Sequence, residues 1–522
     1  MPKAKADTLH DLIKSMTKAE KRHFKMFVNR SQSSQGKLFV KLFDVLDKAK
    51  DFNPSHIFEK IPDLKKRQLS NLKANLYNQI LVTLRLVHRN QNIDIELREK
   101  LDYAKILYNK SLYRQCLEIL SKAKQKAIEH KYFTLTAEML EFEKFVESQH
   151  ITRSIDGRAE ALSNESIEVN DRVRRIQQFS NLAIQLYGLY LKVGHVRNID
   201  DSEFLEEFMH SKLPDYNIKE LSFFEKLYLF QAMVWYHYMR QEFLKYYKYC
   251  QMWIDLFREE PKMIDVYTPL YIKGMHNLMN ACYLTMSGKR FRAAQEEYNN
   301  FLESKRSELS SNELSLMIMF ENVHQFNRHF MEGTFNEGFE LAENLDKIIN
   351  ANTYKWDEHR IMVFYYKIAS LYFGAGDNSK AIDYLNKIIN EFTPNFRGDI
   401  HSFARILSLI AHFELGNELL LSYHIKSVYR FLMKMENMQS VQREILKFLR
   451  KVPSMHKSQL KKEFIALKDQ LKKIEKDPYE KRAYLYLDII SWLESKIKNV
   501  PVQKVIRAKY LKRNKVRENL IS

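Results

Sequence analysis

Apolar side chains in the segment 365–392 follow two helical patterns separated by a short polar stretch. The i, i+3, i+4, i+7 spacing of the first pattern puts four residues on one helical face, and these are Tyr365, Ile368, Ala369 and Tyr372. The second pattern repeats this with Ala381, Leu385, Ile388 and Ile389. The segment therefore predicts two amphipathic helices, the second ending near Pro394, which cannot continue a helix.

The turn between the two helices is rich in glycine and polar residues. Gly374 and Gly376 can supply the left-handed backbone that ends the first helix. Asp377 or Asn378 can accept the free amide hydrogens that begin the second. Helices joined by so short a turn pack antiparallel, and their close contact requires the small side chains that the alanine of each pattern supplies.

This pattern resembles the tetratricopeptide repeat, whose signature is W-x2-L-G-x2-Y…A-x3-F…P. The matching residues are Tyr365, Ile368, Ala369, Tyr372, Ala381, Leu385 and Pro394, with the proline one residue later than the signature places it. The resemblance implies an all-α fold in which antiparallel helical hairpins stack into a right-handed solenoid. It also implies that a concave groove binds a protein or peptide segment of a partner.

Small or apolar residues separated by 12 and then 7 positions recur along the chain. The sets are Ala369, Ala381 and Ile388; Ala104, Cys116 and Ala123; Cys282, Ala294 and Phe301; and, more weakly, Phe326, Gly338 and Leu345, and Val234, Tyr246 and Trp253. The middle members of the last four sets along the chain lie 48, 44 and 43 residues apart, more than in an ordinary tetratricopeptide unit. We therefore expect a long-repeat solenoid over 91–442, although 124–223 shows no clean repeat.

Glycine and proline are scarce, with 12 and 10 residues among 522, which favours helices joined by few, short turns. Neither a signal peptide nor a run of about 18 apolar residues is present. The three cysteines, Cys116, Cys250 and Cys282, lack CxxC spacing and fall at apolar helix positions. We therefore expect an all-α, cytoplasmic protein with reduced, buried cysteines.

The net charge of +19 is concentrated at the two ends of the sequence. Residues 1–90 contain 19 Lys and Arg against 8 Asp and Glu, and residues 443–522 contain 22 against 9. Residues 91–442 have a net charge of −5. This distribution predicts a basic N-terminal helical module that caps the solenoid, the solenoid itself, and C-terminal helices with a basic tail.

The N-terminal module shows the signals of several helices. A capping box of Thr17 and Glu20 opens one that continues to Val28. Further helices are expected over 37–50, 54–61 and 65–89. The last carries four basic residues near its start, Lys65, Lys66, Arg67 and Lys73. Such residues suit phosphate contacts, so a capping bundle and a helix-turn-helix that binds nucleic acid both remain open.

The C-terminal tail is strongly basic. Its charged residues before Glu518 are Arg507, Lys509, Lys512, Arg513, Lys515 and Arg517. Mutual repulsion favours a solvated tail that does not pack, whereas the same charges would suit an anchor for RNA, DNA or an acidic protein. Tyr510 is a single stacking platform, fewer than single-strand binding usually requires.

Motifs for catalysis, cofactors and metals were not found in the sequence. None of the 17 histidines is followed by Glu, as HExxH requires, and no P-loop is present. Gly288-Lys289-Arg290 lacks the earlier glycine of a phosphate cradle and is predicted to be a turn. His324 and His329 are five apart and off a common helical face. We therefore expect a non-enzymatic protein without cofactor or metal.

The densest aromatic stretch lies between Tyr228 and Phe257. Its aromatic residues outnumber what one buried helix face needs, so the surplus is available to line a concave groove beside two cations. The candidate groove residues are Trp235, Tyr238, Arg240, Lys245 and Tyr249.

Three functions are compatible with these observations. The first is an interaction scaffold that holds a protein or peptide segment in its groove. The second is a factor associated with nucleic acid or ribonucleoprotein through its basic ends. The third is a peptide-sensing regulator in which groove occupancy repositions the N-terminal module, a layout similar to that of some bacterial tetratricopeptide regulators.

Overall fold

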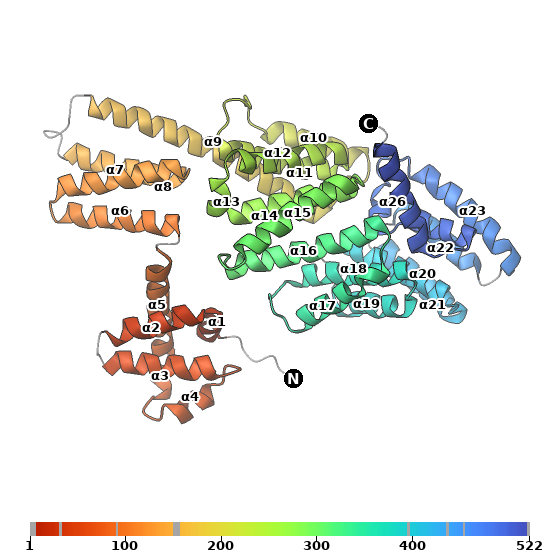
Figure 1. The fold of residues 1–522 in the computed structure, drawn as a ribbon, viewed down its shortest axis with the longest axis horizontal. Helices are drawn as coiled ribbons and strands as arrows, with labels where there is room; N and C mark the ends of the chain where they lie inside the picture. The colour runs from red at the N-terminus through yellow and green to blue at the C-terminus, as the bar shows by residue number, and fades with distance from the viewer. Residues whose placement is uncertain are drawn as a thin grey trace. The chain divides into compact units, whose positions relative to one another are not determined.

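The computed structural model describes residues 7–30, 34–89, 92–149, 157–393, 397–434, 438–452 and 455–518 (Figure 1). All regular elements in these ranges are helices, and no strand occurs among them. The chain divides into two compact units, Met1–Val173 and Arg174–Ser522. Their boundary falls within helix α9 (Arg158–Val193), in the stretch without a clean repeat. The three-part organisation predicted from charge, with limits at 90 and 442, stays a prediction.

The first unit consists of helices with two separate cores before α9. The helices are α1 (Thr8–Ser15), α2 (Lys18–Asn29), α3 (Ser34–Lys48), α4 (Pro54–Lys60), α5 (Lys66–His88), α6 (Ile93–Asn109), α7 (Tyr113–Glu129) and α8 (Phe133–Gln149). One core joins buried residues between 9 and 80, and another those between 97 and 146. The predicted capping box is confirmed, because the backbone N–H of Thr17 donates to Glu20 Oε2 at 2.7 Å and that of Glu20 to Thr17 Oγ1 at 3.2 Å.

The second unit continues from α9 as a series of helices in contact with their neighbours. They are α10 (Ile199–Lys212), α11 (Phe223–Met239), α12 (Phe243–Glu259), α13 (Lys262–Val266), α14 (Thr268–Leu284), α15 (Gly288–Lys305), α16 (Ser311–Glu332), the 3-10 helix η2 (Asn336–Gly338), α17 (Phe339–Asn350), α18 (Glu358–Ala375), α19 (Asn378–Glu391), α20 (Gly398–Glu414), α21 (Glu418–Lys434), α22 (Ser440–Lys451), α23 (Lys457–Ile474), α24 (Arg482–Tyr486), α25 (Ile489–Lys498) and α26 (Val502–Glu518). Consecutive helices such as α11 and α12, α14 and α15, and α18 and α19 pack against each other.

The recurrent small residues lie in the packed interior of these helices. Ala369 in α18 and Ala381 in α19 are fully buried. The other small members of the sets, Ala104, Cys116, Ala123, Cys282, Ala294 and Gly338, are buried as well. An added Cβ at Gly338 would lie 2.8 Å from a methyl of Leu371, so a larger residue here requires Leu371 to shift. The cysteines Cys116, Cys250 and Cys282 are free thiols in the core.

The turn between α18 and α19 differs from the prediction at one glycine. Gly376 has a φ of +93° and ends α18, and the Asp377 side chain caps α19 by accepting a backbone N–H at 3.1 Å. Gly374 is instead buried inside α18, where an added Cβ would approach the Phe335 ring to 2.4 Å. Gly374 is therefore small because of packing and not because of its backbone. Pro394 lies outside the described residues.

The C-terminal helix packs back onto the second unit. α26 contacts α16 and α18 (Figure 1), and Val505, Ile506 and Tyr510 are buried. The Tyr510 ring lies beside Gly288, where an added Cβ would be 2.9 Å from it. The predicted solvated tail is therefore wrong for 502–510, where burial of apolar side chains outweighs repulsion among the basic ones, while the side chains of 511–513 and 515 are exposed. Gly288 also begins α15, so the prediction that it lies in a turn is wrong.

Candidate functional site

Aromatic side chains of α9 and α11 form a contiguous group in the second unit. Between ring centroids, Trp235 lies 4.8 Å from Tyr187 and 5.2 Å from Tyr190. Tyr238 lies 5.5 Å from Tyr190. Tyr187 is 37% exposed and the other rings are half-buried, so protein covers them only in part. We call these four residues the aromatic strip. It contains two of the candidate groove residues and two tyrosines of α9 that the sequence analysis did not find.

The remaining candidate groove residues surround the carboxylate of Glu242. Arg240 Nε lies 3.4 Å and Lys245 Nζ 3.3 Å from its oxygens. Tyr249 stacks on His237 at 5.3 Å, and His237 Nδ1 lies 2.6 Å from the same carboxylate. These three residues are therefore partnered around Glu242 and do not join the aromatic strip.

A polar cluster connects the helices α14, α16 and α18. Its members are Lys273 and His276 of α14, His324 and Asn327 of α16, and Lys367 of α18, and we call them the lysine–histidine cluster. His276 Nδ1 lies 2.9 Å from His324 Nε2. Lys367 Nζ donates a hydrogen bond to Asn327 Oδ1 at 2.7 Å. The ring of His276 also stacks on Phe320 with 3.9 Å between centroids, which holds it in place.

Lys273 joins the lysine–histidine cluster to the aromatic strip. Its Nζ lies 5.5 Å from the centroid of the Tyr187 ring, within the range of a cation–π contact. It also precedes His276 by one helical turn, so the two side chains are neighbours on α14. The strip and the cluster therefore contact each other in the second unit.

Burial disfavours the charged forms of the titratable groups in the cluster. It lowers the pKa of Lys273, and it lowers the pKa of Lys367 to about 8. It also lowers the pKa of His276 to about 3, with further contributions from Lys367 and Lys273, and holds the pKa of His324 well below its usual range. Both imidazoles are therefore neutral at pH 7, while the ammonium groups remain charged.

The two ammonium groups have no acidic partner among the described residues. Lys367 hydrogen-bonds to an amide and lies 5.4 Å from the centroid of the Phe330 ring, and Lys273 contacts the Tyr187 ring. Both lysines and His276 nevertheless keep part of their surface exposed. The cluster therefore presents uncompensated positive charge at a place that protein atoms largely surround.

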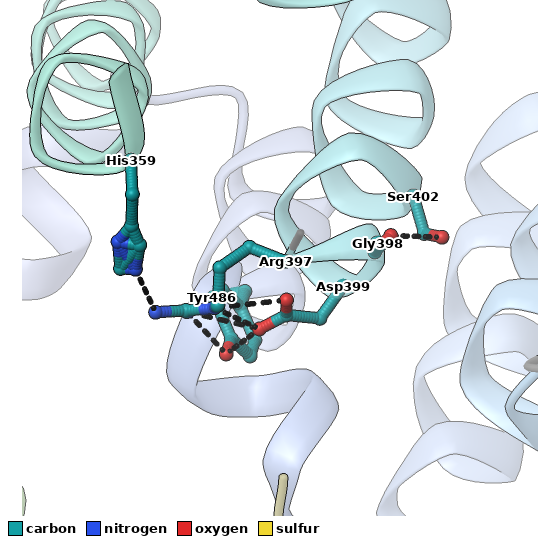
Figure 2. A network of polar contacts seen from close by, with 6 residues as sticks. All are labelled: His359, Arg397, Gly398, Asp399, Ser402 and Tyr486. Carbon is teal, nitrogen blue, oxygen red and sulfur yellow. Dashed lines mark hydrogen bonds and ion pairs between the residues drawn. The ribbon is translucent and has the colours of Figure 1, made fainter. Parts of the chain in front are cut away.

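A second polar network lies at the start of α20 (Figure 2). Arg397, with a φ of +56°, donates to both oxygens of Asp399 at 2.9–3.1 Å and to the Tyr486 hydroxyl at 3.2 Å. His359 Nε2 lies 3.3 Å from Nη1 of Arg397, and Figure 2 shows the Arg397 guanidinium between His359 and Asp399. Burial opposes its charge, but Asp399 raises the pKa of Arg397 above its usual value. This cation, unlike the two lysines, is neutralised within the chain.

The aromatic strip and the Arg397 network lie close to each other. Burial raises the pKa of the Tyr238 hydroxyl well above its usual value, and Tyr190, Tyr486 and Arg397 also act on it electrostatically. Since these groups belong to α9, α24 and the start of α20, helices that are distant in the sequence approach one another on this side of the second unit.

The basic residues of the C-terminal helix divide into partnered and exposed ones. Arg507 Nη1 donates to the backbone oxygen of Glu332 at 3.2 Å. Lys509 Nζ lies 2.8 Å from Ser491 Oγ and 3.0 Å from Glu494 Oε2. Three residues are exposed, Lys512, Arg513 and Lys515, while the side chain of Arg517 lies outside the described part of the chain.

The basic residues predicted at the start of α5 divide in the same way. Three are exposed, Lys65, Lys66 and Arg67. Lys73 forms an ion pair with Asp7, and its Nζ lies 4.4 Å from the centroid of the Phe52 ring. Lys73 therefore stabilises the packing of the N-terminal helices and is not free to contact phosphate.

A cavity of about 380 Å³ in the first unit is lined by charged residues that pair with acids. The pairs are Arg85 with Asp102 at 3.0 Å, Arg98 with Asp94 at 3.0 Å, and Lys105 with Glu138 at 3.4 Å. Because each cation has its own carboxylate, this cavity offers less to a charged ligand than the lysine–histidine cluster does.

In the described ranges, no three His, Cys, Asp or Glu side chains gather as a metal site would require. The same residues include no helix that combines the length and the apolar character needed to cross a bilayer. Comparison with protein-family models, with curated proteins and with solved structures found no match.

Proposed function

We propose that this protein is a non-enzymatic interaction protein that binds an extended segment of a partner protein on the aromatic strip and the lysine–histidine cluster. In this proposal the second unit is a right-handed stack of tetratricopeptide-like hairpins, and α11, α14, α16 and α18 line its concave side. The observation that carries the proposal is the pair of uncompensated ammonium groups of Lys273 and Lys367 beside partly exposed aromatic rings.

The partly exposed aromatic rings and the two lysines both favour a peptide ligand. Aromatic rings that are already held by neighbouring rings offer a large apolar contact area with little further loss of side-chain freedom. The two lysines have already lost much of their hydration, so an anionic group would gain more from them than from lysines in open water. Helical repeat proteins commonly present such surfaces to extended segments.

The proposal is tested by affinity capture from a nuclease-treated lysate of the source organism. The tagged parent protein is compared with the double variant Lys273→Glu/Lys367→Glu and with the control Lys289→Glu/Lys426→Glu, whose two lysines are exposed on α15 and α21. We expect the same partner protein with the parent and the control and its loss with the first variant, while circular dichroism shows all three folded. Equal capture by all three would contradict this binding surface.

A second candidate function is binding of nucleic acid through the exposed basic residues. The observation that favours it is the exposure of Lys512, Arg513 and Lys515 on α26 and of Lys65, Lys66 and Arg67 at α5. With about six phosphate contacts, the logarithm of the affinity would fall with a slope of roughly −5 against the logarithm of salt concentration. A response that is flat in salt would argue against this function.

A further inference from the structure

The two lysines of the lysine–histidine cluster are linked through its histidine pair. Lys273 precedes His276 by one turn of α14, and Lys367 Nζ donates to Asn327, which follows His324 by one turn of α16. Both ammonium groups also lower the pKa of His276, in addition to burial. No described carboxylate is close enough to pair with either, and the remaining partners are the amide of Asn327 and aromatic rings.

The histidine pair determines which hydrogen-bond donor His276 offers. Both rings are neutral, so a single hydrogen lies between His276 Nδ1 and His324 Nε2. His324 Nδ1 is buried without a partner among the described residues. At this buried position, Nδ1 without a hydrogen is tolerated better than an Nδ1–H group without an acceptor. His324 therefore carries its hydrogen on Nε2, which is the hydrogen shared with His276. His276 then carries its own hydrogen on Nε2, as a donor beside the two lysines.

We propose that the lysine–histidine cluster binds a doubly charged phosphate group carried by the partner segment, with Lys273, Lys367 and His276 as its donors. This inference rests on the function proposed above and names the chemistry of its ligand. Asn327 is a positioning residue, because its side-chain oxygen holds the Lys367 ammonium at 2.7 Å.

The charge and the donor count favour phosphate over a carboxylate. A phosphate monoester carries about −1.5 to −2 charges at pH 7 and three acceptor oxygens. The two ammonium groups that flank the histidine pair match this charge, whereas one carboxylate would leave an ammonium group uncompensated. Hydrogen bonds between ammonium groups and phosphate oxygens are also among the stronger ones in proteins.

The first test uses inorganic phosphate and measures the acylation rate of individual lysines in the full chain by mass spectrometry across pH. Titration of phosphate at constant ionic strength should slow the labelling of Lys367 and Lys273 several-fold at pH 8, because a bound anion favours their protonated, unreactive forms. Exposed Lys289 is the internal control. The protection of Lys367 should weaken in Lys273→Met and in His276→Phe. Labelling that does not respond to phosphate would overturn the proposal, and so would protection by acetate alone.

A second test separates this inference from the proposed function. Capture is repeated from a lysate treated with phosphatase, beside an untreated half. Loss of the partner after phosphatase, together with protection of Lys367 by phosphate, supports the inference. A partner that survives phosphatase and still requires Lys273 and Lys367 would overturn the phosphate inference and support the binding surface. If neither half yields a partner, the proposed function fails, while the labelling experiment still decides whether the cluster binds phosphate.

Discussion

The hydroxyl of Tyr366 in α18 donates a hydrogen bond at 2.9 Å to the backbone oxygen of Tyr486, 120 residues later in the sequence. The Tyr486 ring stacks on Phe403 of α20 with 4.6 Å between centroids, and its hydroxyl also donates to Asp399. Figure 2 shows Tyr486 within the network around Arg397. This part of the C-terminal segment is therefore held by residues of both α18 and α20.

Removal of the Tyr366 hydroxyl should loosen that attachment. We expect Tyr366→Phe to lower the free energy of unfolding by about 0.5–1.5 kcal/mol, because the oxygen of Tyr486 loses its hydrogen-bond partner. Tryptophan fluorescence during urea denaturation reports this unit, since all four tryptophans, including Trp492, lie in it. Tyr423→Phe, on a side chain that is 69% exposed, should change little. Equal effects of the two variants would contradict the role of this hydrogen bond.

Two glycines with similar backbones test how α26 docks. Gly333 has a φ of +70°, and an added Cβ would lie 2.6 Å from the backbone nitrogen of Arg507 in α26. Gly416 has a φ of +72° and open space around it. Both alanine variants carry the backbone strain of a positive φ, about 1 kcal/mol, but Gly333→Ala should also displace α26.

Hydrogen exchange gives the readout for this pair. Amides of residues 502–515 should exchange faster in Gly333→Ala than in Gly416→Ala. Equal protection of this segment in both variants would show that the clash does not displace the helix.

The contact between α18 and α19 should not tolerate a large side chain. Ala381→Trp is expected to destabilise the protein by roughly 1–3 kcal/mol, because Ala381 is fully buried and overpacking forces neighbouring side chains apart. Asn386→Trp, at an exposed position of the same helix, is the control. If both variants have the parent's urea midpoint, the packing of this helix pair is not as described.

Lys367 should make stability depend on pH in the alkaline range. Burial lowers the pKa of Lys367 from 10.5 to about 8, so between these values the folded state binds fewer protons than the unfolded state. Its contribution to stability therefore increases with pH over that window. Lys367→Met removes this contribution. The free energy of unfolding of the variant should therefore exceed that of the parent most below pH 8. Urea titrations from pH 7 to 10 should show the difference shrinking, and a constant difference would contradict the low pKa.

A buried ion cluster should matter in the first unit. Lys124 Nζ lies 2.9 Å from Glu143 and 2.7 Å from Glu165, and Arg158 also pairs with Glu143. Lys124→Met should cost about 3 kcal/mol, because the buried Glu143 loses one of its two cations. The double variant Lys124→Met/Glu143→Leu should recover most of that loss. Hydrogen exchange of the amides in α7 and α8 measures the stability of the single and the double variant. A double variant as unstable as Lys124→Met would contradict this account.

The helical pairs could be predicted because their signal is local. Ala369 and Ala381 lie on apolar stripes of adjacent helices, and Asp377 provides a cap within the same segment. The capping box of Thr17 and Glu20 is local in the same sense. Each depends on residues a few positions apart, whose spacing the backbone geometry of a helix determines.

The lysine–histidine cluster was not predicted, because its members come from three helices. Lys273 and Lys367 are single cations in otherwise apolar stretches, YIKGM and YYKIA, and that contrast is the one signal in the sequence. It does not reveal which helices face each other. Gly374 and Tyr510 were misjudged for the same reason, since Phe335 and Gly288, their contacts, lie far away in the sequence.

The return of the C-terminal helices has a consequence for how the protein is made. A ribosome completes α14, α16, α18 and α20 long before it reaches α26. Until the remaining residues are translated, Tyr366, Phe403 and the surface beside Gly288 lack the C-terminal side chains that cover them. During that interval the nascent chain exposes apolar surface that a chaperone can bind. A message cut short before residue 480 would leave this surface exposed for good, and the product would be a substrate for proteolysis.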